Sequence, residues 1–370
     1  MANYKLTIRT LSPLHIGTGR ELCQGFDYIV SSAKPGSPAK TGRLDTDRIL
    51  DAKYEEFRKN PALLPADLIA NETNNPAYFR YILDGRPRSS KADSRLRECI
   101  KDIHDVPYIP GSSIKGAIRT AFGASIISGS MKPARELDLR AKAKYMDNDL
   151  EKKLFGKDPQ NDLFRALLIS DAFLPAEKRD PGKTMEVKNT NPISQQKANS
   201  SVPVELECIK SKLEFTAQLK IDDYVLKEKN FPNSGMLSGQ LMEIIKKHSE
   251  KRLQTIQDWY KESVGADKVN KFITKLQGFS ENQLAKVNNM ALMQMSFGTG
   301  WDGMTYSDWL MSDDEFFEEL YSVHLRRKQN KGRATMREPG TVFPGSRKVV
   351  MLDEIPEIPL GWVLLTLEPK

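Results

Sequence analysis

The 370 residues of this chain are 39% hydrophobic and 28% charged, a composition that supplies a globular core and excludes an intrinsically disordered chain. At roughly 150 residues per domain, the length predicts two domains, or one domain with large insertions. The net charge of +7 and the pI near 9.0 slightly favour an anionic partner.

Several classes of protein are excluded by what the sequence lacks. The first 17 residues contain no long apolar run, and no segment reaches the roughly 18 uncharged apolar residues of a membrane span. Cys23, Cys99 and Cys208 lie far apart, and the four histidines form no HxxxH pair, so neither a disulfide framework nor a zinc site is indicated. We therefore expect a soluble, cytoplasmic protein with no membrane segment, metal site or cofactor.

The elements follow one another along the chain as strands and helices separated by polar insertions. Residues 4–10 alternate as a half-buried strand, a glycine-bearing loop follows, and "FDYIV" at 26–30 predicts a returning strand. Residues 45–103 and 135–155 are polar and helical in pattern, and both are interpreted as insertions. Further elements are a helix after residue 113, a strand in "RALLISDAFL", a strand at 212–219, a helix at 238–260 and a terminal strand at 361–367.

Without its insertions, the order strand, helix, strand, strand, helix, strand predicts an α+β fold. This is the ferredoxin-like split βαβ arrangement that RNA-recognition (RRM-like) modules also use. We expect the core to comprise residues 1–34 and 106–225. Residues 226–370 are expected to form a helical C-terminal part with a glycine-rich loop at 295–303, and they could form a second, degenerate ferredoxin-like half.

The stretch "YIPGSSIKGAIRTAF" (108–122) is typical of a strand that turns into a helix. Ser112 or Ser113 would cap the helix, while Gly111 lets another chain approach its backbone. Lys115 and Arg119 are one turn apart near the positive end of the helix dipole, which predicts an anion site. A plain capped helix with two solvated cations is the alternative.

Two glycine-rich loops are further candidates for contact with a phosphate backbone. "PLHIGTG" contributes His15, Gly17, Thr18 and Gly19, and "MSFGTGWDG" contributes Gly298, Thr299 and Gly300. Neither loop matches a P-loop, and tight turns are the simpler reading of both. Asp27, just after the first loop, could bind Mg²⁺ or take part in RNA cleavage, or it could cap a turn. Among nearby aromatic residues that could stack on a base are Phe26, Phe297 and Trp301.

Basic residues gather in two segments that could contact nucleic acid or simply be solvated. One cluster comprises Arg86, Arg88, Lys91, Arg95, Arg97 and Lys101. The other lies in "HLRRKQNKGRATMR" and includes Arg326, Arg327 and Lys328, which we count among the candidate RNA-binding residues.

Taken together, "TLSPLHIGTG", "FDYIV", "YIPGSSIKGAIRTA", "LLISDA", "VPVELECI" and "FGTGWDG" resemble the RAMP superfamily of CRISPR-associated proteins, in sequence and in order. The resemblance covers the strand–loop segments but not the insertions. Among the branches of the superfamily, the chain looks most like the fifth subunit of the type III-A (Csm) effector complex.

This resemblance implies a non-catalytic, RNA-binding subunit that caps the 3′ end of the guide (CRISPR) RNA. It also implies contacts with target RNA in the assembled complex, with the neighbouring backbone RAMP subunit and with the small helical subunit. Host nucleases that trim the guide's 3′ end are further implied partners. In related backbone subunits an aspartate near the position of Asp27 cuts target RNA.

Three hypotheses remain open at this point. The first is a guide-RNA-binding subunit that supports guide maturation and assembly of the complex in antiviral defence. The second is a metal-dependent endoribonuclease that uses Asp27 with His15 as an assistant. The third is a protein–protein adaptor that works through the two long insertions.

Overall fold

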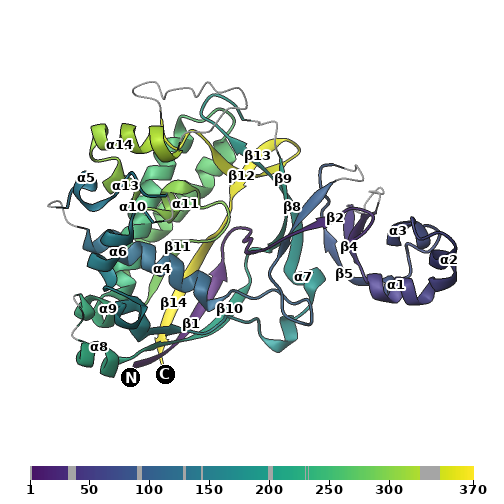
Figure 1. The fold of residues 1–370 in the computed structure, drawn as a ribbon, viewed down its shortest axis with the longest axis horizontal. Coiled ribbons are helices and arrows are strands. Elements are labelled where there is room, and N and C mark those ends of the chain that lie inside the picture. The colour runs from purple at the N-terminus through teal and green to yellow at the C-terminus, as the bar shows by residue number, and fades with distance from the viewer. Residues whose placement is uncertain are drawn as a thin grey trace.

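The structure is a computed structural model, and it describes residues 2–31, 39–89, 94–127, 131–142, 145–198, 203–229, 231, 233–325 and 342–370. No helix in these ranges is long and apolar enough to cross a membrane. Figure 1 shows a helix-rich side, a central sheet and a second sheet that extends away from the helices toward a small helical lobe.

The first sheet has the strand order β11-β14-β1-β10-β7, with every neighbouring pair antiparallel. Its strands are β1 (Ala2–Thr10), β7 (Leu167–Ile169), β10 (Glu214–Ile221), β11 (Met290–Gln294) and β14 (Trp362–Pro369). Helices α4 (Gly111–Ile126) and α10 (Leu241–Lys261) follow β1 and β10 in the chain. The succession β1, α4, β7, β10, α10, β14 confirms the predicted ferredoxin-like core.

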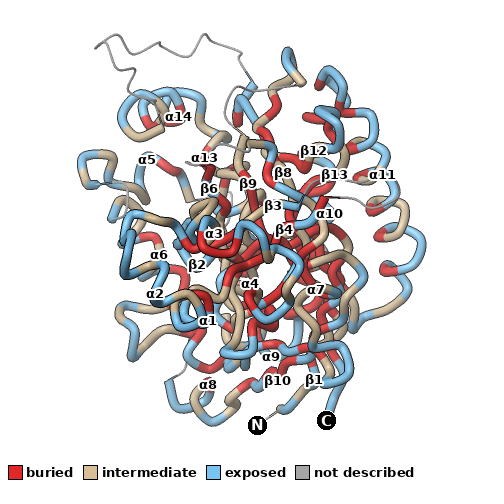
Figure 2. The backbone as a smooth tube through the Cα atoms, turned by 90° about the vertical axis from the view of Figure 1, so that its right-hand side faces the viewer, coloured by how far each residue is buried: buried red, intermediate tan, exposed pale blue. Residues whose placement is uncertain are grey.

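Helices α4 and α10 cover one face of this sheet because their apolar stripes match its inward-facing residues. Leu6 and Ile8 of β1 share a core cluster with Ile114 and Ile118 of α4 and with Ile245 of α10. The opposite face carries the exposed alternating residues of β1 and β10, including Lys5 and Thr216. Figure 2 shows the buried residues following the strands and the inner sides of the helices.

The second sheet has the order β2-β6-β9-β8-β5-β4-β3, with β12 paired to β8 and β13 to β12. It is built almost entirely from segments inserted between the elements of the core. Its strands are β2 (Gly17–Cys23), β3 (Tyr28–Val30), β4 (Lys40–Leu44), β5 (Phe79–Asp84), β6 (Arg95–Cys99), β8 (Met185–Ile193), β9 (Val204–Ile209), β12 (Arg347–Leu352) and β13 (Ile355–Pro359).

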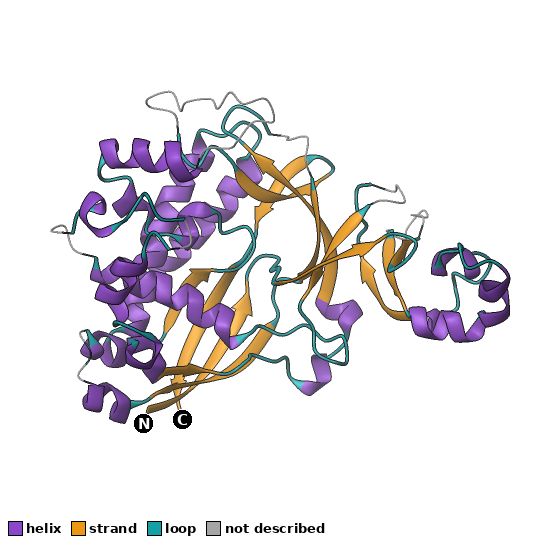
Figure 3. Ribbon diagram, viewed as in Figure 1, coloured by secondary structure: helices purple, strands orange, loops and turns teal. Residues whose placement is uncertain are grey.

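The remaining helices decorate the two sheets, and most of them gather on the helix-rich side (Figure 3). The exceptions are α7, which lies against β5 and β8 of the second sheet, and the lobe of α1, α2 and α3 at the far end of that sheet. These helices are α1 (Thr46–Ala52), α2 (Tyr54–Lys59), α3 (Pro65–Leu68), α5 (Pro133–Glu136), α6 (Asn148–Phe155), α7 (Pro181–Thr184), α8 (Asp223–Lys229), α9 (Ser234–Gly239), α11 (Asp267–Asn282), α12 (Trp301–Met304), α13 (Ser307–Leu310) and α14 (Asp314–Leu320).

Two features of the predicted organisation need correction. The insertion at 45–103 is not helical throughout, because β5 and β6 are strands of the second sheet, and β5 buries Tyr81 and Leu83 at alternate positions. The boundary at residue 226 does not separate two cores either. Strands β11 and β14 complete the first sheet, while β12 and β13 join the second, so the described C-terminal residues have no sheet of their own.

Candidate nucleic-acid interface

The two glycine-rich loops, far apart in the sequence, meet in the structure. We call residues 13–19 together with 295–300 the loop junction. The backbone N–H of Phe297 donates to the carbonyl of His15 at 3.2 Å. A third segment joins them, since Gly361 donates to the Pro13 carbonyl at 3.0 Å and accepts from the Met295 N–H at 2.9 Å. Because only backbone groups make these three bonds, the three segments are joined without the help of any side chain.

Gly361 is required at the centre of this junction for two reasons. Its φ of +83° lies in the left-handed region, where a side chain is strained. A Cβ atom at this position would also collide with the carbonyl oxygen of Met295. The glycine therefore lets β14 approach the second loop closely enough for the backbone bonds to form.

His15 lies behind the loop surface, with a side chain only 2% exposed. Its Nδ1 is 2.6 Å from the carbonyl oxygen of Glu207, which can only accept, so Nδ1 carries the proton and Nε2 is the free acceptor. Burial lowers the pKa of His15 to about 4, which keeps the ring neutral at pH 7. The ring packs edge-on against Phe297 at 5.4 Å between centroids, so it supports the junction from within.

Phe297 presents the most chemically suggestive surface of the junction. Its half-buried ring has the guanidinium carbon of Arg97 5.6 Å and the ammonium nitrogen of Lys348 4.3 Å from its centroid. Arg97 comes from β6 and is 3.5 Å from Glu21 in an ion pair whose side chains are both more than 40% exposed. An ion pair so exposed contributes little to the stability of the fold, so Arg97 can exchange Glu21 for another anion. Two cations and a ring face at one place suit a phosphate with its attached base.

The other predicted residues of the two loops fall into an exposed and a buried set. Gly17, Thr18 and Gly19 are exposed at the start of β2, and the Thr18 hydroxyl donates to Glu98 at 3.3 Å. Thr299 is buried, whereas Gly298 and Gly300 are partly exposed and have positive φ angles. The first loop therefore offers an accessible backbone edge, and the second holds Phe297 in place.

The helix that was predicted to start at 111–119 is present, but its first turn differs from the one that we expected. Pro110 is the N-cap residue, so neither Ser112 nor Ser113 caps the helix. The Gly111 N–H instead donates to the carboxylate of Asp171 at 2.8 Å. At Gly111 the close approach is made by this chain itself, because a Cβ there would collide with the carbonyl oxygen of Ile169. A carboxylate from the same chain thus occupies the first amide of the helix.

Arg119 forms ion pairs within the protein, whereas Lys115 forms none with the described residues. The guanidinium of Arg119 lies 2.6 Å from Glu151 and 2.9 Å from Asp162, and it stacks over the Phe155 ring at 3.6 Å. For Lys115 the described residues offer no ion pair, and burial lowers the pKa of its ammonium group. The predicted pair of cations is therefore one structural arginine and one lysine that is still available.

We expect neutralisation of Lys115 and neutralisation of Arg119 to have different effects, one on RNA binding and the other on stability. Lys115→Gln should reduce the salt slope of RNA binding by about 0.7, the value of one phosphate contact on a single strand. Arg119→Gln should leave that slope unchanged and lower the free energy of unfolding by about 1 kcal/mol through its lost ion pairs. Binding titrations at several salt concentrations and urea unfolding measure the two quantities. A slope reduced by Arg119→Gln alone would contradict this assignment.

Asp27 is held as a structural carboxylate in a turn. It is 4% exposed, and its Oδ1 lies 2.8 Å from Nη2 of Arg20 and 3.2 Å from Nη1 of Arg43. Its Oδ2 accepts the backbone N–H of Cys23 at 2.9 Å. Both oxygens therefore have cationic or N–H partners, and within the described ranges no three His, Cys, Asp or Glu side chains gather as a metal site would require.

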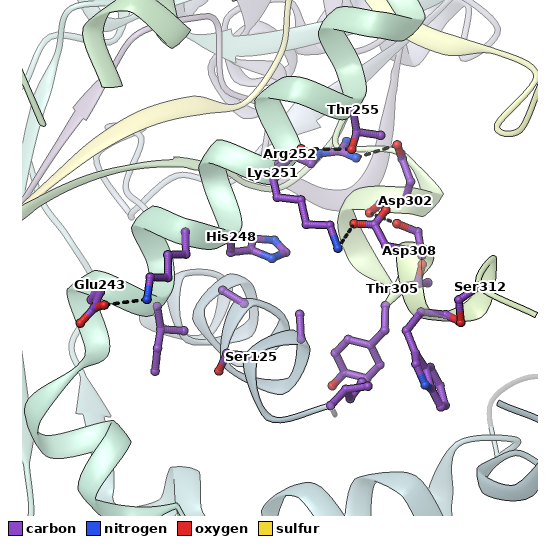
Figure 4. Close-up of a pocket in the computed structure, with 18 of the residues that line it drawn as sticks. Ser125, Glu243, His248, Lys251, Arg252, Thr255, Asp302, Thr305, Asp308 and Ser312 are labelled. Carbon is purple, nitrogen blue, oxygen red and sulfur yellow. Dashed lines mark hydrogen bonds and ion pairs between the residues drawn. The ribbon is translucent and has the colours of Figure 1, made fainter. Parts of the chain in front are cut away.

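A cavity of about 590 Å³ lies between α4, α10 and the segment 301–312 (Figure 4). Its cations have carboxylate partners, with Lys247 2.7 Å from Glu243 and Lys251 2.7 Å from Asp308. Burial also lowers the pKa of His248 to about 4. Because these charges are balanced, the cavity does not favour a phosphate backbone.

Behind the second loop lies a buried cluster of one aspartate and two arginines. Asp302 lies 2.7 Å from Nη1 of Arg252 on α10 and accepts a hydrogen bond from Nη1 of Arg347 on β12 at 3.0 Å. Arg252 also donates to the carbonyl of Thr299. This cluster, which we call the arginine–aspartate triad, ties the second loop to the helix layer and to the second sheet.

Sequence reasoning missed Arg97 with Lys348 as flanking cations, Gly361 and the triad. The sequence places Arg97 only in a basic cluster, and no local pattern links Lys348 to Phe297. The tripeptide "WDG" after the second loop is a weak indication of Asp302.

Other members of the basic cluster that contains Arg97 are paired within the protein. Lys101 is buried against Glu207 at 2.6 Å, and Arg88 pairs with Glu354. Arg326, Arg327, Lys328 and Lys91 lie outside the described residues.

Comparisons with known proteins agree with this architecture. A curated relative, the CRISPR system Cms protein Csm5 of Methanocaldococcus jannaschii, is 23% identical over 96% of this chain and 87% of its own length. The Csm5 protein of Streptococcus thermophilus is 32% identical, over 32% of this chain and 37% of its own.

Two solved structures share the fold over nearly the whole chain. One is a chain of a Csm–crRNA–target RNA ternary complex of a type III-A CRISPR-Cas system, with a TM-score of 0.66 and 20% identity over 98% of this chain and 100% of that one. The other is the crystal structure of T. onnurineus Csm5, with a TM-score of 0.64 and 20% identity over 96% and 99%.

The family model that matches describes the RAMP superfamily, and it spans residues 7–288. That span contains the end of β1, the first glycine-rich loop, α4, β10 and α10. Together with the ferredoxin-like core and the loop that follows its first strand, this match shows that the chain belongs to the RAMP superfamily.

Proposed function

We propose that this protein is an RNA-binding subunit of a type III-A CRISPR effector complex. In this role it caps the 3′ end of the guide RNA and supports its maturation and the assembly of the complex. The names of its curated relatives, both Csm5, and the similarity to a chain of a Csm–crRNA–target RNA complex support this proposal.

The observation that carries the proposal is the loop junction. A scaffold of backbone hydrogen bonds, an accessible glycine edge at 17–19 and two cations over the Phe297 ring suit an RNA backbone recognised by shape. The subunit is non-catalytic in this proposal, because the carboxylate suspected of catalysis is fully engaged in a turn.

The proposal also assigns partners by their chemistry. The guide RNA binds at the junction, and target RNA lies alongside it in the assembled complex. The neighbouring backbone RAMP subunit and the small helical subunit contact the protein, and host nucleases trim the guide's 3′ end beyond it. All of this takes place in the cytoplasm.

Neutralising the two cations tests the proposal. We expect Arg97→Gln with Lys348→Gln to weaken binding of single-stranded RNA more than tenfold near 0.1 M salt, since about 0.7 is lost from the salt slope per phosphate contact. The measurement is a set of fluorescence-anisotropy titrations at four salt concentrations. The matched control is Arg48→Gln with Lys59→Gln on α1 and α2, which removes the same charge from exposed sites on the lobe. Equal losses in the two variants would reduce the effect to net charge and refute the junction as the site.

A further inference from the structure

Two aromatic side chains stack on one another at the surface of the first sheet. The ring centroids of Tyr108 and Phe173 are 5.6 Å apart, and the ring planes meet at 24°. Phe173 is 41% exposed, and Tyr108 is partly exposed. An exposed, nearly parallel pair of rings is costly to leave in water, and it offers a flat apolar face to a ligand.

The backbone holds these rings rigidly. Ile109 and Ala172 exchange hydrogen bonds of 3.0 and 2.8 Å, and Phe173 exchanges bonds of 3.1 and 2.9 Å with Thr216 of β10. Since side chains alternate along a strand, burying Ile109 and Ala172 turns Tyr108 and Phe173 to the other side. The two rings face each other across this short ladder, and their positions are fixed before any ligand binds.

The rings lie on the sheet face that α4 and α10 leave open. Phe173 pairs with Thr216, and Thr216 pairs with Thr7 of β1, so the three side chains share that face. The face is polar and carries charges of both signs, with Lys5 3.8 Å from Glu368 and Arg9 4.0 Å from Glu214 in exposed ion pairs. Aromatic rings on an open, polar sheet face are how RRM-type sheets hold unpaired bases.

The rings also lie at the end of the sheet that carries the loop junction. Thr7 is three residues from the end of β1 at Thr10, and the first glycine-rich loop follows directly. Phe173 follows the end of β7, two residues after the Asp171 that binds the start of α4. The rings and the loop junction therefore lie at the same end of the first sheet, where one strand of RNA that leaves the junction would meet the rings.

We propose that Tyr108 and Phe173 form a stacking platform for an unpaired base of single-stranded RNA. This inference rests on the proposed RNA-binding function and adds a second contact of a different kind. Stacking reads the base face, which every nucleotide has, so the platform would hold RNA without sequence preference. Because Asp171 is close by, a base fits this place better than a phosphate does.

The test compares single-stranded with double-stranded RNA of the same length, using the full chain. Tyr108→Ala with Phe173→Ala should weaken binding of the single strand about tenfold, within the range for a lost stacking contact. Binding of the duplex should stay unchanged because its bases are not available. The salt slope should stay unchanged too, because no phosphate contact is lost.

Matched variants separate the platform from general effects. Phe173→Tyr keeps a ring and should retain wild-type affinity, and Leu168→Ala removes an exposed apolar side chain of β7 that has no ring and should also have no effect. The platform is wrong if the double variant binds the single strand normally, or if it weakens the duplex equally. Such a result would leave the proposed function standing as long as Arg97→Gln with Lys348→Gln still weakens binding, whereas failure of that pair counts against the proposed function itself.

Discussion

Replacing Asp302 by asparagine is expected to lower the free energy of unfolding by about 3–5 kcal/mol, the usual effect of breaking a buried ion pair from one side. The side chain of Asp302 is 1% exposed, and those of Arg252 and Arg347 are 7% and 5% exposed. Without the carboxylate, two guanidinium groups would remain buried close together with no counter-charge. Urea unfolding followed by circular dichroism measures the loss.

The pH dependence of the same variant provides a second measurement. Burial raises the pKa of Asp302, but attraction to Arg252 and Arg347 outweighs burial and brings the pKa below its usual value. A depressed pKa stabilises the folded state above the unfolded-state value of about 4, and that contribution is lost as the pH falls through the folded-state pKa. The difference between wild type and Asp302→Asn should therefore be constant from pH 8 to 5 and shrink below about pH 4.

Asp308→Asn is the control, because it breaks an exposed pair with Lys251 in the same segment of chain. We expect it to cost less than about 1 kcal/mol. If both variants were equally stable, the triad would not be a structural tie. The triad also fixes the carbonyl of Thr299, so partial loss of RNA affinity should accompany the loss of stability in Asp302→Asn.

Replacing Asp27 by alanine is expected to lower the free energy of unfolding by about 3 kcal/mol and to leave RNA cleavage unaltered. The substitution leaves Arg43, whose side chain is 5% exposed, without its carboxylate, and it removes the acceptor of the Cys23 N–H. Unfolding measures the first expectation. Incubation of the assembled complex with Mg²⁺ and RNA complementary to the guide measures the second.

Asp27→Asn is the milder variant for the cleavage test, since an amide oxygen still accepts the Cys23 N–H although Arg43 loses its counter-charge. Glu21→Ala is the control for losing an exposed carboxylate on the same strand as Arg20. If Asp27→Asn folds normally and abolishes a cleavage that the wild type performs, Asp27 is a catalytic residue and the non-catalytic assignment fails.

The order of the core elements was readable from the sequence because each element has a strong local period. Leu6 and Ile8 alternate with polar residues in β1, and Ile114 and Ile118 repeat at helical spacing in α4. Strand β5 was misjudged because its alternating residues follow a long charged segment with helical character, and its strand identity depends on pairing with β4. The long helix expected at 238–260 is divided at Gln240 into α9 and α10.

The candidate site was predictable only in its parts. The glycine-rich loops were recognised, but their meeting depends on Gly361, which pairs with both from a distant part of the chain. Arg119 was expected to face RNA because local spacing puts it beside Lys115. Its actual partners, Glu151 and Asp162, lie in a later segment that no local pattern connects to α4. Hydrophobic periodicity gives no information on ion pairs between residues distant in sequence. A structure is therefore needed to test whether a charged side chain predicted to be free has a partner.

The central position of β1 has a consequence for how the chain is made. Leu6 pairs with Ala217 on one side and with Leu367 on the other, so β1 acquires its second neighbour only when β14 emerges. Pairings this distant in sequence close slowly, and an unpaired strand edge in the meantime invites aggregation. Chaperone dependence during synthesis, and insolubility of chains truncated before β14, are the expected signs of this architecture.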